Sequence, residues 1–446
     1  MRDHRVAIVG AGPAGIYAAD TLTNEHDSAR VDLIERLPAP FGLVRYGVAP
    51  DHPRIKDIVK ALDRVLGKDR IRFLGNVQYG VDLKLDDLRR HYDAVVFATG
   101  AMADRQLAIP GIRLPGSHGA AEFVSWYTGH PDVPRDWPLD AREVAVIGAG
   151  NVALDVARML VKPVEEQLGT EIPANVYAGL RANLATDVHI FARRGPAQVR
   201  FAPMELRELS HSPSVDVIVH PEGFEVDAAG QSAISSNKGT RLVVDTLLRY
   251  LESEPTGAPH RVHIHLCQSP VRVLGNHRVE GLRTQRTELR GDGTVRGTGQ
   301  YLDTPVQAVY RAVGYLSSHL PDLPFDHHAG VLLNDRGRVL DIDGSLLPGL
   351  YVTGWIKRGP AGLIGHTKSD AAETTASLLD DLDALRPRDV LDPDAILDHL
   401  AAGGVTVINA DNWSRIDAHE IALGRERGRE RTKLVPREDM IRAALL

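Results

Sequence analysis

Arg5-Val-Ala-Ile-Val-Gly10-Ala-Gly12-Pro-Ala-Gly15 is an apolar run that ends in three glycines, and residues 16–22 continue it with helical spacing. The pattern predicts a strand, a tight turn and a helix. In such a unit Gly10 permits the turn, Gly12 lets the backbone approach a pyrophosphate, and Gly15 lets the helix sit close to the strand. A second strand is predicted at 29–35 and ends in Glu35, whose carboxylate can accept hydrogen bonds from ribose hydroxyls. The stretch therefore predicts a dinucleotide-binding site.

The pattern returns at Gly148-Ala149-Gly150-Asn151-Val152-Ala153, after a predicted strand at 143–148 and before a predicted helix at 151–160. Alanine in the third glycine position is a permitted variant. The strand predicted at 187–192 runs into Arg193 and Arg194 and carries no acid at its end. Guanidinium groups bind a 2′-phosphate, which a carboxylate would repel, so this site favours NADP over NAD.

The connection in this second unit is long. About 45 residues separate Gly148 from Arg193, whereas ~20 is usual for the distance from the glycines to the ribose-binding residue. We therefore expect an insertion between about residues 162 and 186 that loops out of the unit. Two dinucleotide sites in one chain suggest a tightly bound flavin at one and a transient nicotinamide at the other, with the protein placing one against the other and excluding water.

The composition is that of a globular protein. The chain has 446 residues, 43% of them hydrophobic and 25% charged, which allows two or three domains. The formal net charge of −7 argues against a nucleic-acid binder. No apolar stretch reaches the ~18 residues of a transmembrane segment, and the first residues lack a signal or transit pattern. We expect a soluble, cytoplasmic protein.

Cysteine and histidine usage narrows the chemistry. Cys267 is the only cysteine, so the chain has no internal disulfide, no cysteine-ligated cluster and no CxxC redox pair. Nineteen histidines are present, but none are in the HxxxH or HExxH spacing of a metal site, and we expect no metal.

Four longer strings carry a resemblance to a known family. They are Phe41-Gly-Leu-Val-Arg-Tyr-Gly-Val-Ala-Pro-Asp-His-Pro53, Gly150-Asn-Val-Ala-Leu-Asp-Val-Ala-Arg158, Arg193-Arg-Gly-Pro196 and Gly354-Trp-Ile-Lys-Arg-Gly-Pro-Ala-Gly-Leu-Ile-Gly365. Together they resemble the adrenodoxin reductase family of ferredoxin–NADP reductases, including its bacterial branch. The resemblance runs nearly from end to end and is much more specific than the glycine pattern.

The resemblance implies an architecture and a set of cofactor contacts. The fold would be α/β, with two three-layer Rossmann-like domains: an FAD domain of residues 1–104 and 316–446, and an inserted NADP domain of residues 105–315. FAD contacts would be Ala14, Glu35, Leu43, Trp355, Gly362, Leu363 and Ile364. NADP contacts would be Arg105, Ala149, Gly150, Asn151, Val152, Arg193, Arg194, Glu205 and Gly362.

Two further residues are candidates for the reaction itself. The family places His52 near the flavin, where it could position the nicotinamide or tune the flavin electrostatically; a structural histidine in a Pro-rich turn explains it equally well. Glu208 follows Glu205 by one helical turn and could face the same pocket, or could be a solvated helix acid.

Between about 260 and 313, alternating runs at 262–266 and 282–289 predict antiparallel strands.

The implied reaction passes electrons from NADPH to FAD and then singly to a ferredoxin or adrenodoxin-like iron–sulfur protein. Such acceptors are often acidic, so we expect a local basic patch, with Arg200, Arg207, Lys357 and Arg358 as candidates. We expect a monomer or weak dimer.

Other functions stay open at this stage. A flavin reductase, diaphorase or monooxygenase would use a different acceptor, and a non-catalytic NADPH sensor would show no turnover. A thioredoxin reductase-type enzyme needs two cysteines, and the electron-input subunit of a larger enzyme usually carries extra cysteines for clusters; this chain has neither.

Overall fold

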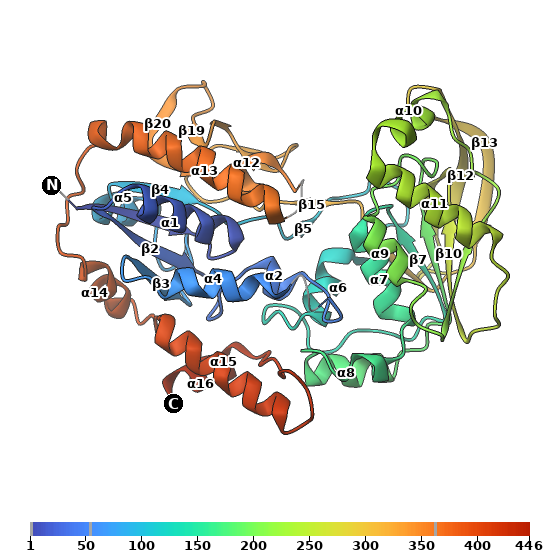
Figure 1. Cartoon of the computed structure of the whole chain (residues 1–446), viewed down its shortest axis with the longest axis horizontal. Helices are drawn as coiled ribbons and strands as arrows, with labels where there is room; N and C mark the ends of the chain where they lie inside the picture. The colour runs from blue at the N-terminus through green and yellow to red at the C-terminus, as the bar shows by residue number, and fades with distance from the viewer. Residues whose placement is uncertain (1–2, 53–55, 361–363) are drawn as a thin grey trace. The chain divides into compact units, whose positions relative to one another are not determined.

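The computed structural model describes residues 3–52, 56–360 and 364–446 (Figure 1). Contacts within the chain divide it into two compact units. Unit 1 comprises Met1–Ala103, Thr128–Pro131 and Tyr315–Leu446, and unit 2 comprises Asp104–Tyr127 and Asp132–Gly314.

Unit 1 is built on a sheet whose described strands lie in the order β18-β19-β20-β4-β1-β2-β3. The parallel strands are β1 (His4–Val9), β2 (Ala29–Glu35), β3 (Ile71–Gly75), β4 (Ala94–Phe97) and β20 (Leu346–Val352). An antiparallel edge is formed by β18 (Asn334–Asp335) and β19 (Arg338–Leu340).

Alternate residues of β1 face two different cores. Val6 and Ile8 pack in a core shared with α1 (Pro13–Glu25) and α13 (Ile364–Asp381). Ala7 and Val9 pack in the core on the other face, with α5 (Leu85–His91) and α14 (Ala395–Ala402). A parallel sheet covered by helices on both faces is the three-layer arrangement of a Rossmann-like unit, as predicted.

Several shorter elements complete unit 1. The first core also takes in α4 (Ile58–Leu66), α15 (Ala410–Arg425) and α16 (Arg437–Leu445). The helical spacing of apolar residues from Ile55 to Leu66 predicts a helix here, and Ile55 itself lies outside the described residues. The remaining elements are α2 (Leu43–Tyr46), β15 (Tyr315–Leu316), β16 (Phe325–Asp326), β17 (Val331–Leu332), α12 (Trp355–Arg358) and η2 (Leu382–Ala384).

Unit 2 has a parallel sheet in the order β6-β14-β7-β8-β10-β9. Its strands are β6 (Ser117–Gly119), β7 (Glu143–Ile147), β8 (Asp187–Phe191), β9 (Val215–Val219), β10 (His260–His265) and β14 (Ala308–Arg311). α7 (Asn151–Val161) packs against β7, β8 and β10. A second, antiparallel sheet of β11 (Gln268–Leu274), β12 (Gly281–Leu289) and β13 (Val295–Thr304) shares a core with Ile147 and Phe191.

One strand prediction was wrong. The 262–266 run was expected in an antiparallel sheet, but β10 pairs in parallel with β8 and β9. Its alternation arises because Val262 and Ile264 are fully buried, while His263 stacks on His189 of β8 and His265 on His220, the residue after β9. Alternation therefore marked two chemically different faces of a central strand. The 282–289 run does lie in an antiparallel sheet, as β12.

The long connection between α7 and β8 holds η1 (Val164–Gln167) and α8 (Ala174–Arg181). β8 nevertheless pairs directly with β7, so the Rossmann order is kept. The other elements of unit 2 are α6 (Ala120–Tyr127), α9 (Pro203–Glu208), α10 (Ala228–Ser236) and α11 (Lys238–Glu252), and β5 (Ala103–Asp104) lies at the boundary.

Residues 128–131 belong to unit 1, whereas they were expected in the 105–315 domain. The Lys433 ammonium donates to the carbonyl oxygens of Thr128 (3.1 Å) and Arg45 (2.6 Å), and the His130 ring packs edge-on against Tyr46. The interleaved Arg and Glu of residues 425–433 predict a solvated face or loop, yet Lys433 is 4% exposed.

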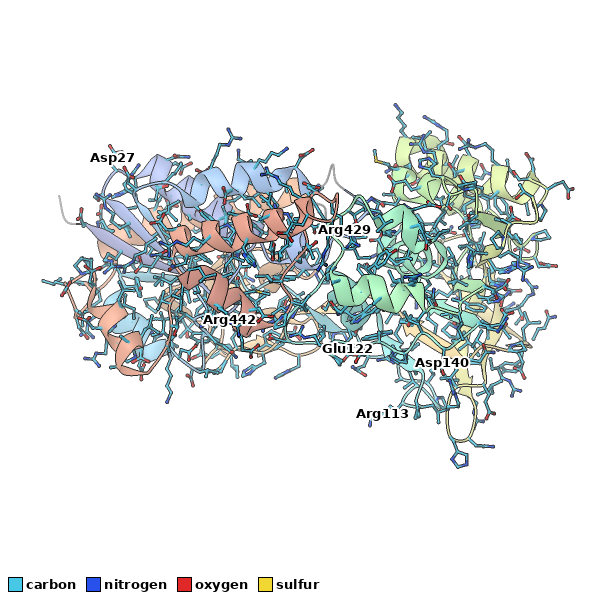
Figure 2. The ribbon with its side chains drawn as sticks, turned by 90° about the horizontal axis from the view of Figure 1, so that it is seen from below. Asp27, Arg113, Glu122, Asp140, Arg429 and Arg442 are labelled. Carbon is cyan, nitrogen blue, oxygen red and sulfur yellow. The ribbon has the colours of Figure 1, made fainter. Side chains whose placement is uncertain are left out.

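Charged side chains of both signs cover the surface, among them Asp27, Arg113, Glu122, Asp140 and Arg442 (Figure 2). Among the helices of the described residues, none is both long and apolar enough to cross a bilayer.

Candidate dinucleotide-binding sites

The first glycine turn of unit 1 is closed by Gly15. A Cβ at Gly15 would lie 1.9 Å from the carbonyl oxygen of Gly10, so only glycine fits there without a backbone shift. Gly12 caps α1 without any side-chain hydrogen bond, which leaves the N–H groups of the first helical turn directed to a ligand. This is the geometry that a pyrophosphate needs.

A second stretch of chain runs beside this turn. The Phe41 N–H donates to the Ala11 carbonyl (2.8 Å), and a Cβ at Gly42 would lie 3.1 Å from the Gly12 Cα. Leu43, the first residue of α2, is thereby held next to the turn. Gly42 has a φ of 47°, which a residue with a side chain would adopt only with strain. The resemblance implied Leu43 as a flavin contact. It implied no such contact for Phe41 or Gly42, which hold Leu43 in place.

The third stretch is the Gly354–Trp355 step at the start of α12. A Cβ at Gly354 would lie 2.7 Å from the Ala14 Cβ, so this step packs directly on the start of α1. The Gly354 N–H donates to the Asp370 carboxylate at 2.5 Å, and Trp355 is half-buried, with its ring 6.4 Å from that of Tyr315. The structure thus brings together Ala14, Leu43 and Trp355, which are distant in sequence.

Glu35 lies at the end of β2, beside the turn. Its carboxylate accepts hydrogen bonds from the Ala11 N–H (2.9 Å) and the Leu37 N–H (3.1 Å). Burial raises the pKa of Glu35, and the two backbone N–H groups oppose that rise. Each carboxylate oxygen keeps a further lone pair, which a ribose hydroxyl can use.

The other flavin candidates lie at the edge of the described residues. Gly362 and Leu363 are outside them, and Ile364 is described only as the first residue of α13. They stay candidates.

In unit 2, the Gly148 N–H donates to the Phe191 carbonyl (3.1 Å), which ties the second glycine turn to the end of β8. Gly150 caps α7 without a side-chain hydrogen bond, so the α7 N-terminus presents N–H groups as the α1 N-terminus does. Ala149 and Asn151 hold the next loop, because the Ala149 carbonyl accepts from the Arg200 N–H (2.7 Å) and the Asn151 side chain accepts from the Ala202 N–H (2.7 Å). Val152 lies in the first turn of α7.

Arg193 and Arg194 follow β8 at this edge of the sheet. Arg193 is exposed and Arg194 half-buried. Burial lowers the pKa of Arg194, and the neighbouring positive charges of Arg193 and Arg200 lower it further. Among the described residues, no carboxylate forms an ion pair with either guanidinium. Two positive charges without a counter-charge favour an anionic ligand.

The remaining nucleotide candidates are more scattered. Glu205 of α9 is 9% exposed, and its carboxylate lies 3.9 Å from the Arg158 guanidinium of α7, so it belongs to a buried ion pair behind the turn. Arg105 donates its N–H to the Gly314 carbonyl (2.9 Å), where the chain enters and leaves unit 2.

His52 lies in unit 1 and Glu208 in unit 2, and each has its own local surroundings. His52 of unit 1 is buried, and its N–H donates to the Ala49 carbonyl (3.1 Å) in a turn. Glu208 is the last residue of α9 in unit 2 and is half-buried. Neither geometry fixes a chemical role, so both stay candidates.

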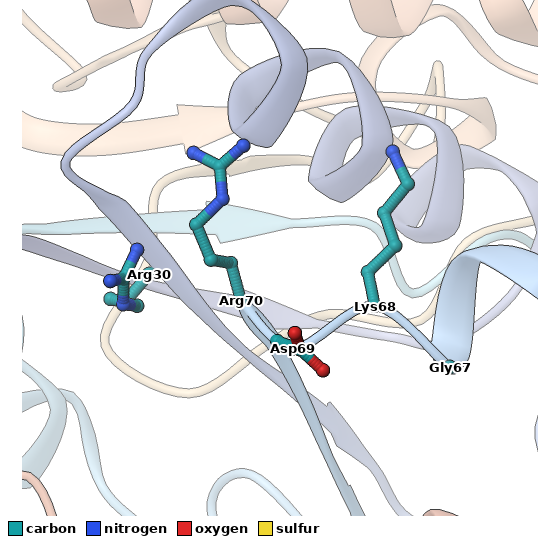
Figure 3. A pocket seen from close by; sticks show the side chains of 5 residues that line it. All are labelled: Arg30, Gly67, Lys68, Asp69 and Arg70. Atoms are coloured by element: carbon teal, nitrogen blue, oxygen red, sulfur yellow. The ribbon is translucent and has the colours of Figure 1, made fainter.

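Lys357 was expected on a basic docking patch, but its side chain is buried, 3.1 Å from the Asp370 carboxylate and 2.5 Å from that of Glu373. A surface hollow around Arg30, Lys68 and Arg70 has three cations (Figure 3), yet Lys68 pairs with Asp20 at 2.6 Å and Arg70 donates to backbone carbonyls. Because Lys68 and Arg70 already have partners within the protein, a structural role explains these cations, and we assign no ligand to this hollow.

Two Rossmann-like units, each with an open glycine turn, define an oxidoreductase that uses dinucleotides. The model of the pyridine nucleotide-disulphide oxidoreductase family matches residues 4–354. Cys267 is the only cysteine in the sequence, so the dithiol chemistry in the family's name has no counterpart in this chain. Its thiol is 1% exposed, and burial raises its pKa to about 11.

Proteins similar to this chain show which group of dinucleotide-dependent oxidoreductases it belongs to. NADPH-ferredoxin reductase FprA of Mycobacterium tuberculosis is 39% identical, with 100% of each chain covered. Mitochondrial NADPH:adrenodoxin oxidoreductase of Mus musculus is 38% identical over 98% of this chain and 91% of its own. The structure of Mycobacterium tuberculosis FprA in complex with NADPH matches with a TM-score of 0.93 over 100% of both chains. The chain belongs to the adrenodoxin reductase family of ferredoxin–NADP reductases, as the sequence motifs indicated.

Proposed function

We propose that this chain binds FAD in unit 1 and NADPH in unit 2, and that it passes electrons from NADPH through FAD, one at a time, to a ferredoxin-like iron–sulfur protein. The proposal rests on two glycine turns, each followed by a helix whose N-terminus has no side-chain cap. Side chains of opposite charge follow the second strand of each unit: Glu35 in unit 1, and Arg193 with Arg194 in unit 2.

The residues of unit 1 fit a flavin dinucleotide. The α1 N-terminus would hold the pyrophosphate, and Glu35 would accept from ribose hydroxyls while its backbone bonds keep it in place. The Gly354–Trp355 step and Leu43 would line the cofactor beside the turn. When bound, FAD supplies the exchange between a two-electron donor and a one-electron acceptor.

The residues of unit 2 fit NADPH. The α7 N-terminus would take its pyrophosphate, and the guanidinium groups after β8 would bind the 2′-phosphate. Hydride transfer needs no general base, so we assign none to His52 or Glu208. We propose that His52 lies near the flavin, where it positions the nicotinamide or tunes the flavin electrostatically, and that Glu208 faces the pocket of Glu205.

The acceptor is proposed from the relatives. The proteins described above as similar to this chain are called NADPH-ferredoxin reductase and NADPH:adrenodoxin oxidoreductase. Their likeness extends over nearly the whole of this chain, so we assign it the same acceptor class.

An anaerobic titration tests the proposal. The purified protein should be yellow, should bleach on addition of NADPH, and should reduce cytochrome c only when a [2Fe–2S] or [4Fe–4S] ferredoxin is added. Bleaching without transfer to any ferredoxin would replace the proposed acceptor with a quinone, oxygen or an organic compound. A colourless protein that cannot be reconstituted with FAD would overturn the flavin site.

A further inference from the structure

Arg200 is held between the second glycine turn and the arginine pair. Its N–H donates to the Ala149 carbonyl at 2.7 Å, and it forms an isolated parallel bridge with Gly150. Two residues on, the Ala202 N–H donates to the Asn151 side chain at 2.7 Å. The backbone on both sides of Arg200 is therefore fastened to the start of α7, which fixes where its side chain leaves the chain.

The loop from Arg194 to Arg200 folds back on itself. The Gln198 N–H donates to the Gly195 carbonyl (3.1 Å), and this turn returns the chain from the end of β8 to the glycine turn. Arg200 lies close enough to Arg194 for its charge to lower the pKa of that guanidinium. Arg200 is exposed, and the described residues offer it no ion-pair partner.

Three guanidinium groups thus share one edge of unit 2 without a counter-charge among the described residues. Such a cluster is repulsive in the unliganded protein, and a dianionic phosphate turns the repulsion into attraction. An arginine that only stabilises the fold usually pairs with a carboxylate. Arg158 of the same unit is an example, because its guanidinium lies 2.8 Å from the Asp155 carboxylate.

We propose that Arg200 is a third 2′-phosphate ligand, which acts with Arg193 and Arg194 to select NADPH over NADH. This inference rests on the proposed NADPH site. It assigns a role to a residue that the sequence placed only among docking candidates, and it removes Arg200 from the acceptor surface.

Binding of 2′,5′-ADP and of 5′-AMP, measured by calorimetry, tests the proposal on the full-length protein. The variants are Arg200→Ala, Arg200→Lys and, as a matched control, Arg181→Ala. Arg181 is an exposed arginine on α8, which leads toward the amino end of β8, whereas the cluster follows the carboxyl end. Thermal unfolding of each variant verifies that it is folded.

We expect Arg200→Ala to weaken 2′,5′-ADP about tenfold, in line with the loss of one charge-assisted contact, and to leave 5′-AMP within about twofold. Arg200→Lys should recover part of the loss, and Arg181→Ala should change neither ligand. Unchanged 2′,5′-ADP binding in Arg200→Ala, or an equal loss for both ligands, would overturn the proposal. A wild-type protein with no preference for 2′,5′-ADP would instead overturn the NADPH site itself.

Discussion

The two glycine turns share one backbone plan and differ in the residues after the second strand. The Gly10 N–H donates to the Ile34 carbonyl (2.7 Å), and the Gly148 N–H donates to the Phe191 carbonyl (3.1 Å). These equivalent bonds make Ala192 of unit 2 the counterpart of Glu35 of unit 1. Ala192 is 1% exposed, so a buried methyl group stands where the carboxylate would be, and the guanidinium groups come after it.

This difference separates two properties of a dinucleotide site. The turn and the uncapped helix provide for a pyrophosphate in both units, whatever the rest of the ligand. The side chains after the strand set the charge preference: an acid suits free ribose hydroxyls, and arginines suit a 2′-phosphate. A change on one side of this pair should therefore alter selectivity without removing the site.

The largest expected effect is on nucleotide selectivity. We expect the double variant Arg193→Ala/Arg194→Ala to bind NADPH about a hundredfold or more weakly, since each charged hydrogen-bonding group contributes roughly 1.5–3 kcal/mol. Binding of NADH should change little. Rates of anaerobic flavin bleaching against each nucleotide concentration measure both, and the absorbance of bound FAD shows whether unit 1 is intact. An unchanged preference for NADPH over NADH would contradict the assignment of these arginines.

A smaller effect is expected at the third position of each turn, where unit 1 has Gly15 and unit 2 has Ala153. Gly15→Ala would bring a methyl group against the Gly10 carbonyl, so we expect a loss of about 2 kcal/mol in FAD binding or stability, as for an overpacked site. Ala153→Gly is the matched exchange, and it should cost at most about 1 kcal/mol from helix propensity. FAD retention after gel filtration and thermal unfolding measure both. Equal effects of the two variants would show that the turns are packed alike.

Local sequence signals were sufficient for both turns. Gly10 to Gly15, Glu35 and the arginine pair are each specified by neighbours within a few residues, so the elements around them could be predicted from the sequence. Leu43 and Trp355 reach the first turn through contacts that span tens to hundreds of residues. Only the resemblance to a family pointed to them.

Other features had no sequence signal at all. Lys433 lies in a run of Arg and Glu typical of solvent, yet two distant carbonyl oxygens bury its ammonium group. Lys357 was misplaced for a similar reason, because Asp370 and Glu373 of α13 neutralise it. Local charge patterning cannot reveal a partner supplied by a remote segment.

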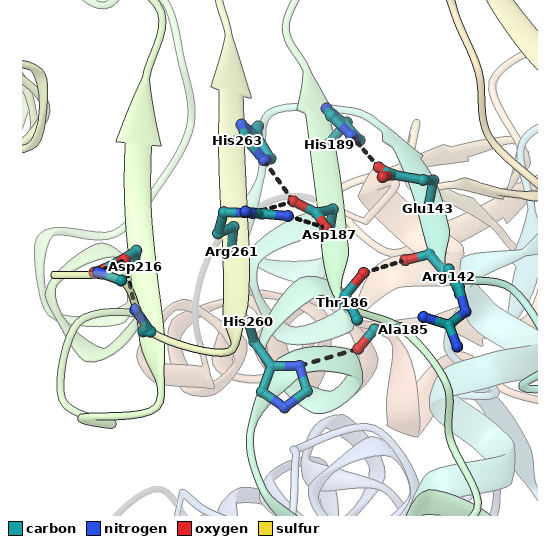
Figure 4. A network of polar contacts seen from close by, with 12 residues as sticks. Arg142, Glu143, Ala185, Thr186, Asp187, His189, Asp216, His260, Arg261 and His263 are labelled. Atoms are coloured by element: carbon teal, nitrogen blue, oxygen red, sulfur yellow. Dashed lines mark hydrogen bonds and ion pairs between the residues drawn. The ribbon is translucent and has the colours of Figure 1, made fainter. Parts of the chain in front are cut away.

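The smallest predicted effect is a loss of stability in acid, and it arises from a stack of histidines in unit 2. These histidines lie on β8, on β10 and directly after β9. His189 contacts Glu143 (2.9 Å), and His263 contacts Asp187 (3.0 Å) (Figure 4). His189 also contacts His265 (3.0 Å), and His263 also contacts His220 (3.3 Å). The two pairs stack on each other, with ring centroids 4.5 Å apart for His189 and His263, and 4.2 Å for His220 and His265.

The stack should make unit 2 sensitive to acid. Burial lowers the pKa of His189 from 6.5 to about 4 and also lowers the pKa of His220, His263 and His265. A histidine with a lowered folded-state pKa contributes stability that is complete above about pH 6.5 and is lost as the pH falls toward the folded-state value. Glu143 opposes this in part, because burial raises its pKa.

Hydrogen exchange of β8 and β10, corrected for the intrinsic pH dependence, measures the effect. Between about pH 7.5 and pH 5.5 we expect His189 alone to account for about 1 kcal/mol of lost protection. His189→Phe should flatten the profile, whereas His277→Phe, at an exposed histidine of the same unit, should not. Protection in the parallel strands of unit 1, where no such stack is described, should change less over this range. A profile that is the same for wild type and His189→Phe would show that folding does not lower the pKa of His189, and the contrast between the two units would then rest on the glycine turns alone.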